Sequence, residues 1–111
     1  MSSEPLDYLR HIQIEVEFLL SSSSGRTFRD FQADEVLTRA FVRSLEIIGE
    51  ATKKLPNSFR ASHPEVAWRA MAGMRDRLIH DYMGVDYELV WDVVQTSIPE
   101  LHDQIARILS A

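Results

Sequence analysis

Apolar residues recur at helical spacing along almost the whole of this chain, and this pattern limits the available folds most strongly. It is clearest between about Asp34 and Leu55, where apolar side chains return every three, four or seven residues, at Leu37, Phe41, Leu45, Ile48 and Leu55. Such spacing gathers them on one face of an amphipathic helix. Glycine and proline are sparse and strand signals are weak, so we expect an all-α fold.

Two other helical segments lie near the ends of the chain. The first is expected over about residues 4–20, with Ser3 as its capping residue, and the serine-rich stretch 21–25 then predicts a loop. Asp86 is expected to cap the last segment, which Pro99 either kinks or divides into two helices. With short loops between them, these segments predict a four- to five-helix up-and-down bundle.

A further helix is expected to begin near Ser62. Ser62 and Glu65 can form a capping box, with Pro64 in the first turn. Gly84 is a natural left-handed stop for this helix. Residues 75–82 would therefore occupy its last two turns.

Length and composition fit a single domain covering residues 1–111. There is no cysteine, which excludes disulfides and thiolate metal sites and suits a reducing cytoplasm. The first residues lack the apolar core of a signal peptide, and no apolar run is long enough to span a membrane. The net charge of −5 argues against broad coating of nucleic acid, although it allows a small basic site.

The densest chemistry is the pattern Arg75-x4-His80-x-Tyr82. It places a permanent cation, a base that titrates near neutrality and a phenol on one short segment. Arg75 can hold phosphate oxygens in a charge-assisted fork, and His80 can move a proton beside them. RNA cleavage needs no metal in such a site, because the 2′-hydroxyl is the internal nucleophile. Without other support, each residue alone is more readily explained as a helix cap or a core anchor.

On one straight helix, Arg75 and Tyr82 share a face, whereas Arg75 and His80 lie roughly 140° apart. Either the helix distorts near His80, or a second copy of the helix completes the site. We favour a symmetric dimer, because two-fold dimers are the commonest oligomers.

Three other residues are candidates for supporting roles. Glu46 and Glu50 flank Gly49 one turn apart and either orient Arg75 or His80 or form a solvated face. Gly49 costs roughly 1 kcal/mol in a helix interior relative to alanine. Close approach of another helix, within the chain or across a dimer, would compensate. Arg77 either widens the basic patch or is ordinary surface charge. The remaining histidines lack metal-ligand spacing, so no metal or other cofactor is expected.

Three stretches, residues 43–51, 68–82 and 85–91, closely resemble the HepT family of HEPN-domain toxins, whose signature is Arg-x4-His-x-Tyr. The resemblance implies a helical homodimer with a composite site at the subunit interface and metal-independent ribonuclease activity. Arg75 and His80 match the catalytic pair. Tyr82 matches the position to which a nucleotidyltransferase antitoxin of the MntA type transfers AMP.

Two other functions stay open from the sequence. A non-catalytic module could bind a nucleotide or a nucleotidyltransferase partner through the same basic site. A purely structural helical dimer, in which the motif caps a helix, is the least favoured. RNA turnover that depends on His80 would separate the enzyme from both.

Overall fold

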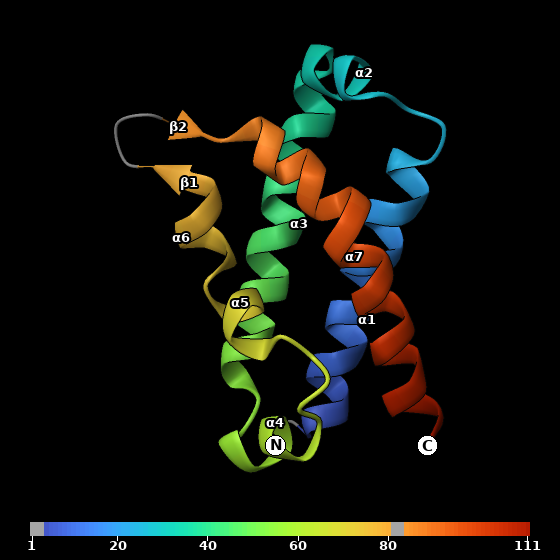
Figure 1. Ribbon diagram of the computed structural model, residues 1–111, viewed down its shortest axis with the longest axis vertical. Helices are drawn as coiled ribbons and strands as arrows, with labels where there is room; N and C mark the ends of the chain where they lie inside the picture. The colour runs from blue at the N-terminus through green and yellow to red at the C-terminus, as the bar shows by residue number, and fades with distance from the viewer. Residues whose placement is uncertain (1–3, 81–83) are drawn as a thin grey trace.

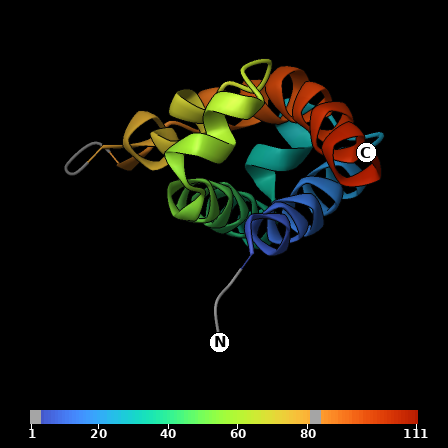
Figure 2. The same cartoon turned by 90° about the horizontal axis from the view of Figure 1, so that it is seen from below.

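The computed structural model describes residues 4–80 and 84–111, without the side chain of His80. Three long helices dominate it: α1 (Pro5–Ser23), α3 (Glu35–Lys54) and α7 (Tyr87–Ser110). Helix α1 packs against both α3 and α7, and Figure 2 shows it between them along one side of the molecule. The short helices α4 (Asn57–Ser62) and α5 (Trp68–Ala72) cross the opposite side.

The chain follows the up-and-down course that was predicted. In Figure 1 it rises through α1, descends through α3, rises again through short helices and descends through α7. The all-α fold is therefore confirmed. The rising third leg differs from the prediction because it consists of short pieces rather than one long helix.

The predicted apolar stripe of α3 faces the core. Phe41, Leu45 and Ile48 are fully buried. They belong to one apolar core together with buried side chains of α1 and α7, among them Leu9, Ile12, Val16, Val90, Ile98 and Ile105. Asp34 caps α3, accepting a hydrogen bond from the Leu37 N–H at 3.0 Å, and Leu55 follows its last residue. The predicted bounds of this helix are thus confirmed.

The ends of the chain differ in detail from the sequence expectation. Helix α1 continues to Ser23, so the predicted loop over residues 21–25 is wrong in its first half. The buried Ser23 donates a hydrogen bond to the Leu20 carbonyl, which satisfies its hydroxyl inside the helix. Ser3 lies outside the described residues, and Glu4 is the capping residue. Asp86 caps α7 as predicted, and α7 continues through Pro99 as one helix.

A short helix, α2 (Phe28–Ala33), was not predicted. Its Phe31 is completely buried, with its ring centroid 5.1 Å from that of Phe41 and 5.3 Å from that of Trp91. Thr27 and Asp30 form a reciprocal capping box at its start. Hydrogen bonds from the backbone and the hydroxyl of Thr27 hold the pKa of the Asp30 carboxyl below its ordinary value.

The helix predicted to start at Ser62 and end at Gly84 is wrong. Ser62 is the last residue of α4, so it caps nothing. The indole N–H of the buried Trp68 donates to the carbonyls of Arg60 at 3.1 Å and His63 at 2.9 Å. These bonds tie α5 back onto the end of α4, and the intervening backbone leaves the helical path.

The helical backbone is interrupted again at Gly73 and ends at Leu78. Helix α6 (Met74–Leu78) gives way to β1 (Ile79–His80), which pairs antiparallel with β2 (Gly84–Val85). Ile79 lies opposite Val85, His80 lies opposite Gly84, and the Asp86 N–H donates to the Leu78 carbonyl at 2.8 Å. These hairpin bonds replace further helix. Gly84 has the expected positive φ of 77°, but in a strand rather than at a helix end.

Within residues 4–80 and 84–111, no helix combines the length and apolar character needed to cross a membrane.

Candidate active site

Helix α6 presents charged side chains to solvent because its two ends are anchored in the core. Met74 and Leu78 are almost completely buried, while Arg75, Asp76 and Arg77 between them are exposed. Met74 and Leu78 are one helical turn apart and therefore share the face that packs against α3. The sequence thus forces Arg75 outward at a fixed place on the surface.

Arg75 pairs with a carboxylate of α3. Its Nε lies 3.5 Å from Oε2 of Glu46. The Arg75 side chain is 58% exposed, whereas that of Glu46 is only 24% exposed. Glu46 is therefore the more buried partner and can orient the longer side chain. The contact uses Nε, whereas the terminal nitrogens of a guanidinium can donate a fork of hydrogen bonds to phosphate oxygens.

Gly49 lets the segment carrying Arg75 approach α3. A Cβ at this position would lie 3.1 Å from the Met71 carbonyl oxygen and 3.9 Å from Cβ of Met74. The close approach expected at Gly49 is confirmed, and it is made within the same chain by α5 and α6. This contact fixes the position of α6 along the axis of α3, so that Arg75 lies beside Glu46.

The second candidate carboxylate has a different partner. Oε1 of Glu50 lies 3.6 Å from Nη1 of Arg43, and both side chains are mostly exposed. Glu50 also lines a shallow pocket beside Tyr8 and His11 of α1. The structure therefore brings Glu46, but not Glu50, to Arg75. Arg43 was not predicted, although its separation of seven residues from Glu50 places the two on one helix face.

His80 lies in β1, two residues beyond the end of α6, and its side chain is outside what the structure describes. Tyr82 lies outside the described residues altogether. The angle of roughly 140° between Arg75 and His80 assumed a helix that continues past Leu78. Because that helix ends, the angle no longer applies. The dimer then depends on the family resemblance rather than on helix geometry.

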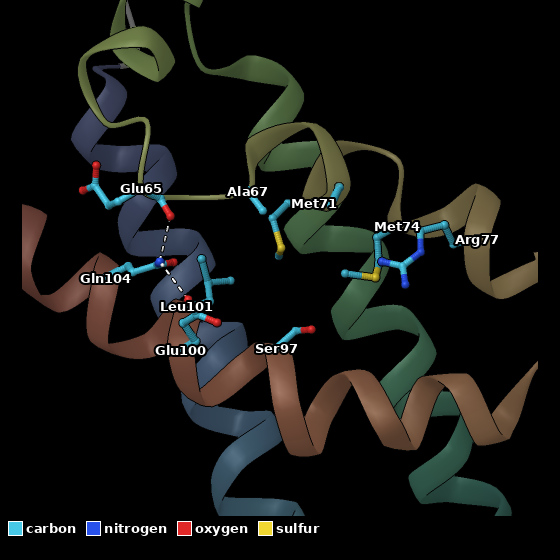
Figure 3. Close-up of a pocket in the computed structure, with 10 residues that line it drawn as sticks. Glu65, Ala67, Met71, Met74, Arg77, Ser97, Glu100, Leu101 and Gln104 are labelled. Atoms are coloured by element: carbon cyan, nitrogen blue, oxygen red, sulfur yellow. Dashed lines mark hydrogen bonds between the residues drawn. The ribbon is translucent and has the colours of Figure 1, made fainter.

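Arg77 faces away from Arg75. Two residues along an α-helix correspond to about 200° of rotation. Arg77 accordingly lines a pocket between α5, α6 and α7, with Met74 beside it (Figure 3). It does not share the Arg75–Glu46 contact, so the two arginines serve different surfaces of α6.

In the described part of the chain, no three His, Cys, Asp or Glu side chains gather closely enough to hold a metal ion.

Comparison with known proteins places these residues in context. A family model described as HepT-like, "Ribonuclease HepT-like", matches residues 8–108. The chain belongs to the HepT-like ribonuclease family. The match covers all of α3, most of α1 and α7 and the whole Arg75–Tyr82 motif, and it supports the expectation that this chain is an endoribonuclease.

Curated relatives agree with the family. A protein of Caldanaerobacter subterraneus subsp. tengcongensis named "Putative RNase TTE0752" is 55% identical over 95% of this chain and 94% of its own length. A protein of Thermococcus cleftensis named "Probable ribonuclease HepT" is 43% identical over 92% of this chain and 93% of its own. A Methanocaldococcus jannaschii protein named "Putative RNase MJ0127" is 38% identical over 92% of this chain and 84% of its own. No solved structure matches the chain.

Proposed function

We propose that this HepT-like protein is a metal-independent endoribonuclease that acts as the toxin of a toxin–antitoxin pair. The observation that carries the proposal is the intact Arg75-x4-His80-x-Tyr82 motif in a chain whose family is described as ribonuclease. The exposed Arg75, held by Glu46 at 3.5 Å, supports a role in binding phosphate.

Arg75 and His80 would divide the chemistry between them. The guanidinium of Arg75 holds the non-bridging oxygens of the scissile phosphate and stabilises the charge that develops there. His80 takes the proton of the 2′-hydroxyl or gives a proton to the departing 5′-oxygen. The 2′-oxygen bonds to phosphorus as the bond to the 5′-oxygen breaks. The products are a 2′,3′-cyclic phosphate and a free 5′-hydroxyl.

A homodimer would bring two such motifs together. In this arrangement Arg75 of one chain and His80 of the other meet at the interface, so that the catalytic site forms only in the dimer. The family resemblance supports this arrangement.

Tyr82 would be the position at which the activity is switched off. A nucleotidyltransferase antitoxin of the MntA type would transfer AMP from ATP to the phenol oxygen and release pyrophosphate. The modification adds a bulky phosphate-bearing group two residues from His80 and opposes binding of an RNA phosphate by charge repulsion.

Growth of cells expressing the chain without an antitoxin tests the proposal. We expect the wild type to arrest growth and to generate RNA fragments with 2′,3′-cyclic phosphate ends. Arg75→Ala and His80→Ala should relieve both effects without loss of folded protein. Arg39→Ala, which removes an exposed arginine paired with Glu35 on α3, is a matched control and should stay toxic. Toxicity that persists in both motif variants would overturn the catalytic assignment.

A further inference from the structure

A pocket of about 110 Å³ lies between α5, α6 and α7, on the side of α6 opposite Arg75. Figure 3 shows its lining residues. Apolar side chains form its floor, mainly those of Met71, Met74 and Leu101, all of them buried. Arg75 is not among the described residues that line this pocket, and membership of the family does not by itself indicate what the pocket binds.

Polar groups of opposite charge stand at the two ends of the apolar floor. Figure 3 shows Glu100 and Gln104 of α7 at one end and the guanidinium of Arg77 near Met74 at the other. The side-chain amide of Gln104 donates to the Glu65 backbone carbonyl at 2.9 Å and to a carboxylate oxygen of Glu100 at 3.5 Å. Gln104 therefore ties α7 to the chain before α5 and also contacts the exposed Glu100 carboxylate.

Glu65 contributes its backbone rather than its charge. In Figure 3 its carboxylate points away from Gln104, while its carbonyl oxygen receives the hydrogen bond. The charged groups that line the pocket are therefore the carboxylate of Glu100 and the guanidinium of Arg77.

The size of the pocket limits its occupant. Pockets for whole small molecules typically measure about 300–1,000 Å³. A pocket of about 110 Å³ is too small for a complete nucleotide and suits a single flat ring system. An apolar floor, a hydrogen-bond acceptor at one end and a cation at the other match a nucleobase with its attached phosphate. Single-stranded RNA is recognised in this way, by unstacked bases bound along their Watson–Crick edges.

The carboxylate selects among the bases. Guanine carries two adjacent donors, N1–H and the 2-amino group, which match the two oxygens of one carboxylate. Adenine and cytosine place a ring acceptor beside their amino group, and uracil has one N–H between two carbonyls. Each of these would direct a lone pair at the exposed carboxylate of Glu100, and repulsion between the lone pair and the carboxylate oxygens disfavours these bases relative to guanine.

We infer that this pocket binds a guanine base of the RNA substrate, with Glu100 accepting from its N1–H and 2-amino group and Arg77 holding an adjoining phosphate. The inference rests on the proposed ribonuclease activity. Arg75 and Arg77 lie on opposite faces of the same five-residue helix, whose diameter with side chains is about 10–12 Å. The guanine would therefore lie within one or two nucleotides of the cleaved bond and would set the cleavage preference.

Replacement of guanosine by inosine tests the inference, because inosine lacks only the 2-amino group. Two short single-stranded RNAs that differ in this way are cleaved by the purified full-length protein. We expect the wild type to cleave the guanosine RNA about tenfold faster or more. Glu100→Gln should cleave both RNAs at similar rates, because an amide offers one acceptor where guanine needs two. Arg77→Ala should raise KM for both RNAs and keep the preference for guanosine.

Asp103→Asn is the matched control. It removes one exposed carboxylate from the same helix, outside the pocket, and should keep the wild-type preference. Equal cleavage of the two RNAs by the wild type, or an unchanged preference in Glu100→Gln, would overturn the base pocket while leaving the ribonuclease proposal intact. If the wild type cleaves neither RNA, the ribonuclease proposal fails and the inference fails with it.

Discussion

Arg75 and Glu46 meet where α6 packs on α3, with Nε of the arginine 3.5 Å from Oε2 of the glutamate. If Arg75 binds the scissile phosphate as proposed, this contact would have two opposing effects on phosphate binding. The carboxylate orients the guanidinium, which lowers the entropy cost of positioning it. It also competes with the phosphate for the same cation. In the proposed ribonuclease, Glu46 would therefore be a positioning residue that acts through Arg75.

Glu46→Gln should separate these two effects. Loss of the competing charge is expected to leave KM for RNA unchanged or lower it, while loss of orientation reduces kcat by about tenfold. Glu50→Gln makes the same chemical change one turn along the helix, where the partner is Arg43, and should alter neither constant. Steady-state cleavage kinetics of the two variants give the comparison. Equal effects at Glu46 and Glu50 would mean that general surface charge, rather than the Arg75 contact, is responsible.

Gly49→Ala should lower stability even though alanine is the better helix former. The new Cβ would lie 3.1 Å from the Met71 carbonyl oxygen, which belongs to the backbone of α5 and cannot yield alone. Overpacking of this kind costs about 1–3 kcal/mol, more than the roughly 1 kcal/mol gained in helix propensity. Urea unfolding should therefore show a net loss of about 1 kcal/mol, and RNA cleavage should fall as α6 shifts.

Gly73→Ala is the control for that substitution. Its Cβ would meet the Arg69 carbonyl oxygen at 3.5 Å, an ordinary contact, so stability should change by less than about 0.5 kcal/mol. A Gly49→Ala protein more stable than the wild type would show that α5 is free to move away from α3.

A mixed dimer tests the composite site. Arg75→Ala and His80→Ala chains carrying different tags are co-expressed, and the species bearing both tags is purified. If Arg75 and His80 act from opposite chains, this dimer retains one intact site and about half of the wild-type activity. If both residues act within one chain, every site in the mixed dimer is defective. An inactive mixed dimer would therefore contradict the interface arrangement but not the ribonuclease assignment.

Modification of Tyr82 can be read from intact mass. Co-expression with a nucleotidyltransferase antitoxin should add one or more AMP units and abolish RNA cleavage. Tyr82→Phe should gain no mass and stay active, since the phenol oxygen is the acceptor. Tyr87→Phe, five residues along the chain at the start of α7, should be modified like the wild type. A mass gain that survives in Tyr82→Phe would assign the acceptor elsewhere.

Features of the fold that depend on local signals could be predicted from the sequence, whereas features that depend on contacts with residues further along the chain could not. The bounds of α3 were predictable because its cap at Asp34 and its apolar stripe are local signals. The break after Ser62 was not, because it depends on hydrogen bonds from the Trp68 indole to carbonyls five and eight residues earlier. The β1–β2 hairpin likewise competes with a helical continuation that the sequence alone favours.

The residues of the candidate site could likewise be predicted only in part. The motif identified Arg75 and His80 as candidate catalytic residues. The close approach predicted at Gly49 is confirmed. Which glutamate supports Arg75 could not be decided, because Glu46 and Glu50 lie one turn apart on the same helix. The choice is set by where α5 and α6 dock on α3, which is a tertiary contact.

Cleavage of single-stranded RNA by purified protein in excess metal chelator would show whether Arg75 and His80 cleave RNA without a metal ion. We expect the wild type to cleave under these conditions. Arg75→Ala and His80→Ala should each reduce the rate by about 100-fold or more, whereas Arg39→Ala should not. Cleavage that stops on chelation, or that persists in His80→Ala, would contradict a metal-independent site built on Arg75 and His80.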